Sequence, residues 1–442
     1  MELIQQIKDA GIIGAGGAGF PTHAKLASQA EFILMNGAEC EPLLRVDQQL
    51  MDVYGDEIIQ GFVMAGRAVE AKKAIIGIKK KHSVVIRKLN ERIRALNLSD
   101  FVEVGELPDI YPAGDEQVLV YELTGRIVPE TGIPIMVGCV VVNSETALNI
   151  YKASQGQAVT EKYITVTGDV PHRVTVKVPV GTPIIDVLKL SGIDDFSDYA
   201  VIDGGPMMGP VMANLDGYVT KKNKGFVILP KDHFLIRKKS VTPEQAKRVN
   251  KATCEQCRMC TDLCPRFLLG HSMQPHKMML AQNYQFGDVE NQSLAQLCCQ
   301  CNLCELFSCP AGLHPKMANM YFKGLLAEKG VRYQPQKSEY EARSIRKYRL
   351  VPSKRLIARL GLTAFDRPAP LSEDVLVPQT VRIYTRQHVG APAAPCVGVG
   401  EHVAKGQLIG HIPAEALGAA IHSSIDGVVS AVTQDYIEVR SV

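Results

Sequence analysis

Apolar and polar residues alternate in two different ways along the first part of the chain. Short, mostly apolar runs at 31–36 (EFILMN) and 73–78 (KAIIGI) are typical of buried strands. A longer stretch at 82–96 (HSVVIRKLNERIRAL) repeats its apolar residues with the period of a helix. Because strand-like and helix-like stretches follow one another, the pattern predicts an α/β layer structure over residues 1–155.

The pattern changes beyond this domain. Residues 160–235 are interpreted as a hairpin, a turn and a helix, and 240–325 carry most of the cysteines on helix-like stretches. A basic, proline-punctuated connector follows at 330–375, and 388–432 has short strands separated by glycine turns. We expect the basic residues of the connector, and those of the run Lys79–Lys81, to lie on solvated surface.

The composition excludes some classes of protein. At 442 residues the chain is too long for one core, which predicts several domains. A hydrophobic content of 46%, a charged content of 21% and a net charge of +3 give no bulk signal for nucleic-acid binding. The longest apolar run, 133–142, is about half the length of a membrane span, and the N-terminus lacks a signal-peptide pattern. We therefore expect a cytoplasmic protein that spans no membrane and binds no nucleic acid.

Nine of the 12 cysteines lie within residues 254–309, and in a reducing compartment such clustering points to metal. The first run has the spacing C-x2-C-x2-C-x3-C-P, and the second has C-x2-C-x2-C-x4-C-P. Three cysteines at two-residue gaps hold one [4Fe–4S] cluster, while the fourth reaches the neighbouring cluster when two such runs pair. The pattern assigns one cluster to Cys254, Cys257, Cys260 and Cys309, and the other to Cys298, Cys301, Cys304 and Cys264.

Zinc is the alternative metal, because two C-x2-C pairs can bind one zinc ion. That interpretation leaves four thiolates unexplained, so the two-cluster interpretation is preferred. The ninth cysteine, Cys299, is interpreted as a small buried residue. The four-residue gap before Cys309 departs from the usual three. The spacing therefore defines the geometry of the first cluster less well than that of the second.

The glycine-rich stretch 14–19 (GAGGAG) matches the G-x-G-x-x-G pattern of dinucleotide-binding folds. That pattern requires a strand before the loop, yet Leu3, Ile4 and Ile7 repeat with helical spacing. Pro21 follows soon after the loop and suits the first turn of a short helix. The loop is therefore interpreted as a phosphate-binding turn at a helix start and not as a Rossmann fingerprint.

Four short motifs, which occur in a fixed order ahead of the cysteine runs, resemble a known family. They are GAGGAGFPTHAK (14–25), NGAECEP (36–42), YPAGDEQ (111–117) and VNSETAL (142–148). They are similar to the flavin-site segments of the flavoprotein subunit of respiratory complex I. They are more similar still to its relatives, the C subunit of the Rnf complex and the cobalamin reductase of propanediol-utilisation microcompartments. The resemblance extends to about residue 320 and implies that the glycine loop binds FMN.

The resemblance also implies which residues hold the cofactors. The phosphate end of FMN would lie on Gly14, Gly16, Gly17 and Lys25. The isoalloxazine and ribityl would lie along Asn36, Glu39 and Cys40, and the site would be closed by Tyr111, Gly114, Asp115, Asn143 and Thr146. Glu41 and Glu116 match positions that meet the nicotinamide nucleotide of NADH. No side chain is assigned as a catalytic acid or base.

We expect a multidomain fold that combines α/β and β units. The expected segments are an FMN- and NADH-binding α/β domain (1–155), a β-grasp module (156–238), an α-helical ferredoxin-like domain with two [4Fe–4S] clusters (239–325), a basic connector (326–375) and a C-terminal barrel-sandwich hybrid (376–442). The β-grasp module follows from the resemblance. The last segment reads HSSIDG (422–427) where a lipoyl domain would present its lysine, so it carries no swinging arm. Its Cys396, His402, His411 and His422 are interpreted as structural or solvated.

Together these features predict a flavin and iron–sulfur oxidoreductase. Electrons from NADH would pass through FMN and two [4Fe–4S] clusters to cobalamin, from cob(III)alamin to cob(II)alamin and cob(I)alamin, in support of B12-dependent diol metabolism. The acceptor follows from the resemblance alone. The alternative is a non-catalytic electron-transfer subunit of an Rnf-like complex. The resemblance further implies a cobalamin adenosyltransferase and a microcompartment shell as partners, and a location inside a bacterial microcompartment.

Overall fold

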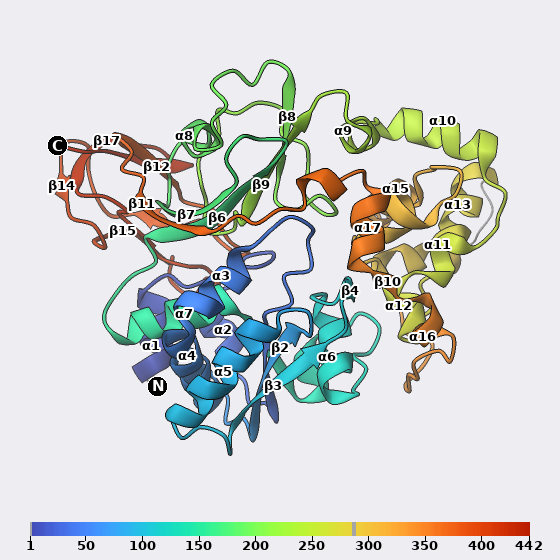
Figure 1. The fold of residues 1–442 in the computed structure, drawn as a ribbon, viewed down its shortest axis with the longest axis horizontal. Helices are drawn as coiled ribbons and strands as arrows, with labels where there is room; N and C mark the ends of the chain where they lie inside the picture. The colour runs from blue at the N-terminus through green and yellow to red at the C-terminus, as the bar shows by residue number, and fades with distance from the viewer. Residues whose placement is uncertain (1, 285–288) are drawn as a thin grey trace.

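The computed structural model describes residues 2–284 and 289–442. In Figure 1 the N-terminal domain lies at the bottom, with the other units above it and to its sides. Residues 285–288 belong to the predicted 239–325 domain and lie outside the described residues. The predicted fold class is confirmed: an α/β domain, a mixed sheet, a helical unit and a pair of small sheets follow one another along the chain. Within the described residues, no helix is long and apolar enough to cross a membrane.

A four-stranded parallel sheet forms the centre of the N-terminal domain. Its strands, in spatial order, are β3 (Val102–Leu107), β2 (Lys73–Lys79), β1 (Phe32–Asn36) and β5 (Cys139–Asn143). The helices are α1 (Glu2–Asp9), α2 (Thr22–Leu26), α3 (Val46–Val53), α4 (Gly55–Ala68), α5 (Ser83–Ala95), α6 (Glu116–Thr124) and α7 (Ser144–Ser154). A two-residue strand, β4 (Ile110–Tyr111), and a 3-10 turn, η1 (Pro134–Val137), complete the domain.

Helices cover both faces of this sheet, which is why its strands are apolar along their whole length. Ile33 points to one face and belongs to the core cluster that includes Phe62 of α4 and Leu148 of α7. Leu34, one residue further on, points to the other face and packs in the cluster of Leu119 on α6. The sheet therefore has one core on each face. In open α/β sheets of this kind, ligands bind at the carboxyl edge of the strands.

The second unit is a mixed five-stranded sheet in the order β11-β7-β6-β9-β8. Its elements are β6 (Glu161–Gly168), β7 (Val174–Pro179), α8 (Ile184–Lys189), β8 (Tyr199–Asp203) and β9 (Gly225–Pro230), followed by α9 (Phe234–Lys239). The predicted hairpin is the antiparallel pair β6–β7. The edge strand β11 (Leu371–Val375) arrives from the connector and lies parallel to β7.

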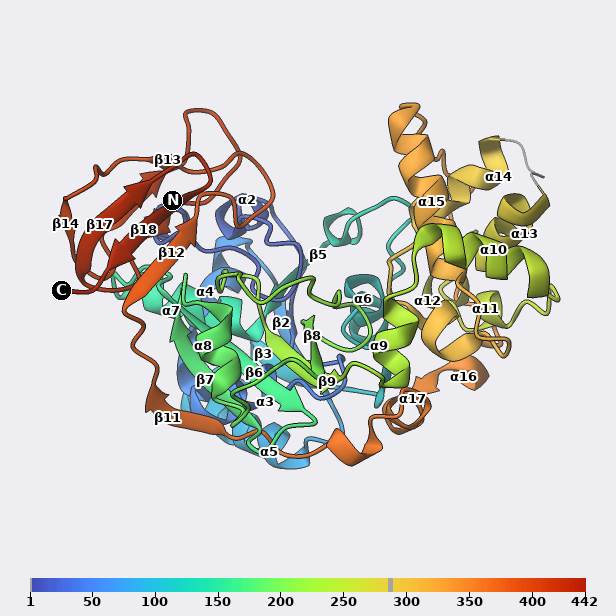
Figure 2. The same ribbon diagram turned by 90° about the horizontal axis from the view of Figure 1, so that it is seen from above.

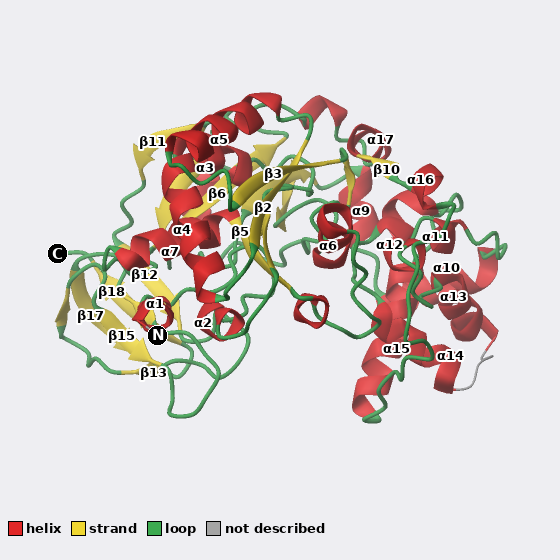
Figure 3. Ribbon diagram, turned by 90° about the horizontal axis from the view of Figure 1, so that it is seen from below, coloured by secondary structure: helices red, strands yellow, loops and turns green. Residues whose placement is uncertain are grey.

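The cysteine-bearing unit is helical and occupies one end of the molecule, as the red helices of Figure 3 show. Its helices are α10 (Pro243–Thr253), α11 (Met259–Asp262), α12 (Pro265–Leu268), α13 (Pro275–Tyr284), α14 (Val289–Ser293) and α15 (Pro315–Glu328). A 3-10 turn, η2 (Leu294–Leu297), and a π-helical turn, η3 (Cys304–Ser308), lie between α14 and α15. Leu268, Met278 and Phe322 contribute to its core.

The C-terminal unit lies at the opposite end from the cysteine-bearing helices (Figure 2). One sheet has the order β12-β18-β17-β14 and the other β13-β15-β16. The strands are β12 (Thr380–Tyr384), β13 (Ala394–Pro395), β14 (His402–Val403), β15 (Leu408–His411), β16 (Ile421–His422), β17 (Gly427–Val432) and β18 (Tyr436–Arg440). His402 and His411 are exposed, whereas His422 is buried and its pKa is lowered to about 3 by burial.

The connector corrects one expectation, because part of it is built into the other units. Its elements are α16 (Arg346–Arg349), β10 (Val351–Pro352), α17 (Ser353–Arg359) and the 3-10 turn η4 (Thr363–Phe365). Strand β10 pairs with β4 of the N-terminal domain. The basic pattern predicts Arg346 on solvated surface, but its side chain is only 12% exposed and pairs with Glu122 of α6.

The expectation for Lys79 is also wrong. Lys80 and Lys81 are exposed as expected, but the Lys79 side chain at the end of β2 is 1% exposed. Its Nζ donates to Ser353 Oγ at 3.1 Å and lies 3.6 Å from Asp109 Oδ1. The connector covers this strand end, so a lysine that local sequence places in solvent is buried by a segment 274 residues away.

Candidate functional site

The candidate site lies at the carboxyl edge of the parallel sheet, where β1 and β5 end in Asn36 and Asn143. These two residues are direct neighbours in the parallel register. Asn143 Nδ2 donates to the Asn36 carbonyl at 3.3 Å, and its Oδ1 accepts from the Glu145 N–H at 3.0 Å, which caps α7. Asn36 Nδ2 donates to the Gly114 carbonyl at 2.8 Å. Two predicted flavin-site motifs thus meet at adjacent strand ends.

The glycine loop lies against the first turn of α7. The Ala15 N–H donates to Thr146 Oγ1 at 3.1 Å, which holds the loop to that helix. A Cβ added at Gly16 would approach Asn143 Nδ2 to 3.1 Å, whereas one added at Gly17 would meet no atom within 4 Å. In the described part of the chain, the N–H groups of Gly16 and Gly17 have no hydrogen-bond acceptor. The loop therefore offers open space and free donors, which suits a phosphate.

Lys25 belongs to α2 and reaches the same edge of the sheet. Its Nζ donates to the Val141 carbonyl at 3.0 Å and to Glu116 Oε1 at 3.0 Å. The Glu116 side chain is 44% exposed, so it keeps access to solvent. One predicted phosphate-binding residue and one predicted nucleotide-binding residue are therefore brought together as an ion pair.

Glu39 is buried beneath the site and contacts two charged groups. Its Oε2 accepts from the Asp47 N–H at 2.5 Å, and its Oε1 lies 3.7 Å from Lys224 Nζ. Burial, followed by the nearby Asp47 carboxylate, raises the pKa of Glu39 to about 7. Lys224 directly precedes β9 of the second unit and also pairs with Asp47. This buried charge set fixes the second unit against the site.

Glu41 and Tyr111 face the second unit and the cysteine-bearing unit. The Glu41 carboxylate accepts from the N–H groups of Met207 and Met208 at 2.8 and 3.0 Å, and its Oε1 lies 3.5 Å from Tyr111 Oη. Burial raises the pKa of Glu41. Glu41, predicted to bind the nicotinamide nucleotide, therefore hydrogen-bonds to the loop between β8 and β9 of the second unit.

Cys40 is next to Gly114, where a Cβ would approach its Sγ to 3.1 Å. Only glycine allows the two predicted site segments to pack this closely. Burial raises the pKa of Cys40 to about 11, so its thiol stays protonated at neutral pH.

Two predicted flavin-site residues contact the cysteine-bearing unit directly. Asp115 caps α6 by accepting from the N–H groups of Gln117 and Val118, and its carboxylate also forms a two-point ion pair with Arg266 of α12. Tyr111 is 2% exposed and donates from Oη to the Cys301 carbonyl at 2.7 Å. The candidate flavin site and the cysteine runs are therefore in contact.

The first group of thiols comprises Cys254, Cys257, Cys260 and Cys309. Burial, and then the nearby thiols of Cys309, Cys254 and Cys257, raise the pKa of Cys260 to about 12. Cys309 belongs to the second run, so the structure brings the expected crossed residue to the first group. Cys257 is exposed at the surface.

The second group comprises Cys264, Cys298, Cys301 and Cys304. Burial, and then Cys298, raise the pKa of Cys304, to which Cys260 and Cys264 also contribute. In the described residues no group of three or more His, Cys, Asp and Glu side chains is arranged to hold a single metal ion. The two groups of four thiols have, instead, the donor chemistry that iron–sulfur clusters require.

Cys299 lies beside the second group and packs against the core cluster that contains Cys301. The sequence suggests a buried small residue, whereas the structure shows a half-buried one. Its thiol is therefore a neighbour of the second group and not an inert core residue.

The two cysteine runs share an unusual backbone. Gln256 and Arg258 flank the second cysteine of the first run with φ of 52° and 64°. Gln300 and Asn302 occupy the matching positions of the second run with φ of 59° and 67°. Non-glycine residues adopt this left-handed conformation rarely and mostly at functional sites. The repeat shows that both runs fold into the same kind of turn.

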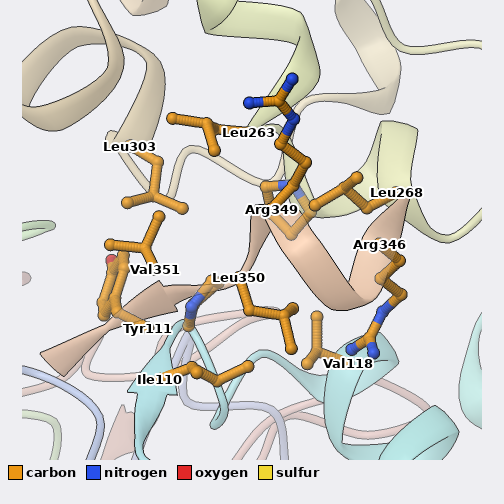
Figure 4. A pocket seen from close by; sticks show the side chains of 12 residues that line it. Ile110, Tyr111, Val118, Leu263, Leu268, Leu303, Arg346, Arg349, Leu350 and Val351 are labelled. Atoms are coloured by element: carbon orange, nitrogen blue, oxygen red, sulfur yellow. The ribbon is translucent and has the colours of Figure 1, made fainter.

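The junction between the N-terminal domain and the cysteine-bearing helices is well packed. A cavity of about 20 Å³ lies between α6, α12, α16 and the β4–β10 pair. Figure 4 shows Tyr111, Val118, Leu263, Leu303 and Val351 around it. This volume is enough for about one water molecule and too small for a cofactor.

Sequence reasoning missed four charged residues at the site, of which three are buried and one, Lys224, is half-buried. They are Asp47, Lys162, Lys224 and Arg266. Lys162 pairs with Glu145 and donates to the Ala15 carbonyl at 3.3 Å, beneath the glycine loop. Only Arg266 had a sequence signal, since it follows the Cys-Pro pair that ends the first cysteine run.

Comparison with known proteins gives the class. Residues 7–152 match the Nuo51 FMN-binding domain, 253–314 match the 4Fe-4S dicluster domain, and 369–441 match the RnfC barrel sandwich hybrid domain. With the glycine loop and the two thiol groups, these matches define a flavin and iron–sulfur oxidoreductase.

Relatives then identify the family. The chain is 43% identical over 438 residues to "Cobalamin reductase PduS" of Citrobacter freundii, covering 98% of this chain and 95% of that protein. It is 33% identical over 267 residues to the C component of the Na(+)-translocating ferredoxin:NAD(+) oxidoreductase complex of Acetobacterium woodii, covering 59% of this chain and 57% of that one. The chain belongs to the cobalamin reductase PduS family.

A solved structure shows the fold alone. It is an NAD+-reducing [NiFe]-hydrogenase in the H2-reduced state, with 21% sequence identity and a TM-score of 0.50. The likeness covers 74% of this chain and 61% of that one.

Proposed function

We propose that this protein is a cobalamin reductase that takes electrons from NADH and delivers them through FMN and two [4Fe–4S] clusters to cobalamin. The observation that carries the proposal is the near full-length similarity to a cobalamin reductase, 43% identity with 95% of that protein covered. The unbroken contact from the glycine loop to the cysteine runs supports it.

When bound, FMN accepts an electron pair as hydride and releases single electrons, which iron–sulfur clusters carry one at a time. The chain's own residues supply binding and position. Gly14, Gly16, Gly17 and Lys25 would hold the phosphate, and the free N–H groups of the loop fit this role. Asn36, Glu39, Cys40, Gly114, Asn143 and Thr146 would line the flavin, with Tyr111 and Asp115 between it and the cysteines.

The two thiol groups have different places in this arrangement. Cys264, Cys298, Cys301 and Cys304 would hold the cluster on the flavin side, because Tyr111 and Arg266 connect that group to the flavin domain. Cys254, Cys257, Cys260 and Cys309 would hold the other cluster, whose exposed Cys257 lies at the surface. Cys304 is within electrostatic reach of Cys260, so the two groups are neighbours.

Glu116 is the better placed of the two acids for the nicotinamide nucleotide. It is 44% exposed beside Lys25, whereas Glu41 is held by backbone N–H groups of the neighbouring unit. A cobalamin adenosyltransferase would be the partner, because cob(I)alamin is readily oxidised if released to solvent. The protein would work with it in the cytoplasm, inside a propanediol-utilisation microcompartment and near its shell.

An anaerobic titration with NADH, followed by visible absorbance with and without cobalamin, tests the proposal. NADH should bleach the flavin and cluster absorbance, and added cob(III)alamin should restore it while cob(II)alamin forms. Bleaching that persists with cobalamin and adenosyltransferase present would contradict the proposal. That outcome would favour the alternative, an electron-transfer component like the one in the Acetobacterium woodii complex.

A further inference from the structure

We propose that Arg266 is a positioning residue that holds the Cys264–Cys298–Cys301–Cys304 thiol group against the flavin site and raises the reduction potential of the cluster bound there. The inference rests on the proposed function, which supplies the cluster.

The geometry joins the two sites through a single side chain. Arg266 Nη1 and Nη2 donate to Asp115 Oδ1 and Oδ2 at 2.5 and 2.9 Å, a two-point pair that fixes the guanidinium in its plane. Both side chains are nearly buried, at 10% and 13% exposure. Asp115 is itself fixed as the N-cap of α6. The pair therefore sets the position of α12 relative to the flavin domain.

Arg266 is tied equally closely to the cysteines. It follows Cys264, the N-cap residue of α12, by two residues and lies within that short helix. Its guanidinium is within electrostatic reach of Cys299 and Cys264, and also of Cys298. Arg266 is thus a permanent positive charge, out of water, between an acid at the flavin site and the second thiol group.

The sign of its effect follows from charge. A cluster becomes more negative when it is reduced, so a nearby positive charge favours the reduced state and raises the potential. Asp115 partly offsets this effect, because its negative charge acts on the neighbouring Cys299 in the opposite sense and more weakly than Arg266 does. Removal of Arg266 and removal of Asp115 should therefore move the potential in opposite directions. A purely mechanical role would not give opposite signs.

The junction contains a matched control. Arg346 pairs with Glu122, also on α6, and its 12% exposed side chain lies over the ring of Tyr121. Figure 4 shows it next to Val118, at the same interface. No thiol is among its contacts in the part of the chain that the structure describes. Loss of Arg346 should weaken the interface without changing a cluster potential.

The experiment is an anaerobic redox titration of the holoprotein, followed by electron paramagnetic resonance of each cluster. It compares wild type with Arg266→Gln, Arg266→Lys, Asp115→Asn and Arg346→Gln. We expect one of the two cluster potentials to shift to lower values in Arg266→Gln and to higher values in Asp115→Asn. Arg266→Lys should lie between wild type and Arg266→Gln, and Arg346→Gln should match wild type.

Unchanged potentials in both Arg266→Gln and Asp115→Asn, or shifts of the same sign, would overturn the inference. If Arg266→Gln does not retain the cluster, Asp115→Asn decides: a higher potential supports the inference, and an unchanged or lower one overturns it. Iron and sulfide are measured first. Wild-type protein without clusters would contradict the proposed function, whereas normal clusters with unmoved potentials would contradict only this inference.

Discussion

The two ends of the molecule are attached to the flavin domain by different kinds of contact. At the cysteine end, the Arg266–Asp115 pair and the Tyr111–Cys301 hydrogen bond connect residues of two candidate cofactor sites. At the C-terminal end, the buried Lys221 donates to the carbonyls of Gly11 and Ala420 and has no acid beside it in the described residues. The first junction therefore joins residues of two candidate cofactor sites, whereas the second joins backbone carbonyls of two units through one buried lysine.

The largest effect should come from the thiol groups at the cysteine end. Cys301→Ala and Cys257→Ala should each remove about half of the roughly eight iron atoms expected per chain. They should differ in what remains, because Cys301 lies beside the flavin domain and Cys257 is exposed. NADH should still reduce the remaining cluster in Cys257→Ala but not in Cys301→Ala.

Iron analysis and electron paramagnetic resonance after NADH addition measure this difference. Cys396→Ala is the control, since that exposed cysteine lies in the C-terminal unit and should leave the iron content unchanged. Equal reduction of the remaining cluster in both variants would remove the distinction between the two thiol groups.

A smaller effect is expected at the glycine loop, which belongs to the domain between the two ends. Gly17→Val should fill the open space beside the loop and lower flavin affinity by about tenfold or more, or ~1.4 kcal/mol. Cluster content should stay normal. Gly324→Val is the matched control, because it is exposed on α15 and its Cβ would also meet nothing within 4 Å. Flavin retention that is the same in both variants would show that the loop does not bind the phosphate.

Lys221 gives a pH effect specific to the C-terminal junction. Burial lowers its pKa from 10.5 to about 7, so the unfolded chain binds more protons between these values. The stability of wild type should therefore rise with pH across this window, relative to Lys221→Met, by roughly 1 to 4 kcal/mol. Chemical unfolding at pH about 7 and about 9.5 measures this, with the exposed Lys222→Met as control. If the difference in the free energy of unfolding between wild type and Lys221→Met is the same at both pH values, the assigned pKa is contradicted.

The smallest effect is expected for the exposed histidines of the C-terminal sheets. His402→Ala and His411→Ala should change stability by less than about 0.5 kcal/mol and leave cobalamin reduction unchanged. A loss of cobalamin reduction in either variant, measured with NADH, would give this end of the molecule a part in the chemistry.

Features with a local pattern could be predicted from the sequence. The α/β alternation follows from apolar runs, and the crossed thiol groups follow from the cysteine spacing together with the pairing of two runs. The expected flavin-site segments meet at the ends of β1 and β5 because parallel strands share a carboxyl edge. These elements depend on neighbours in sequence or on a repeated motif.

Features that depend on a distant partner could not be predicted. Arg266 and Asp115 are 151 residues apart, and Lys224 and Asp47 are 177 apart, so no local pattern marks them as pairs. The basic run around Lys79 indicates solvent, but Ser353 comes from a distant segment and helps to bury it.

The most direct test of the account is single-turnover transfer to cobalamin. Wild type and Cys301→Ala, both with full flavin, are reduced anaerobically with NADH and then mixed with cob(III)alamin. The account predicts that cob(II)alamin appears with wild type and stays at background with Cys301→Ala. The reason is that electrons leave the flavin only through the cluster that this thiol group would hold. Equal rates of cob(II)alamin formation in the two proteins would contradict it.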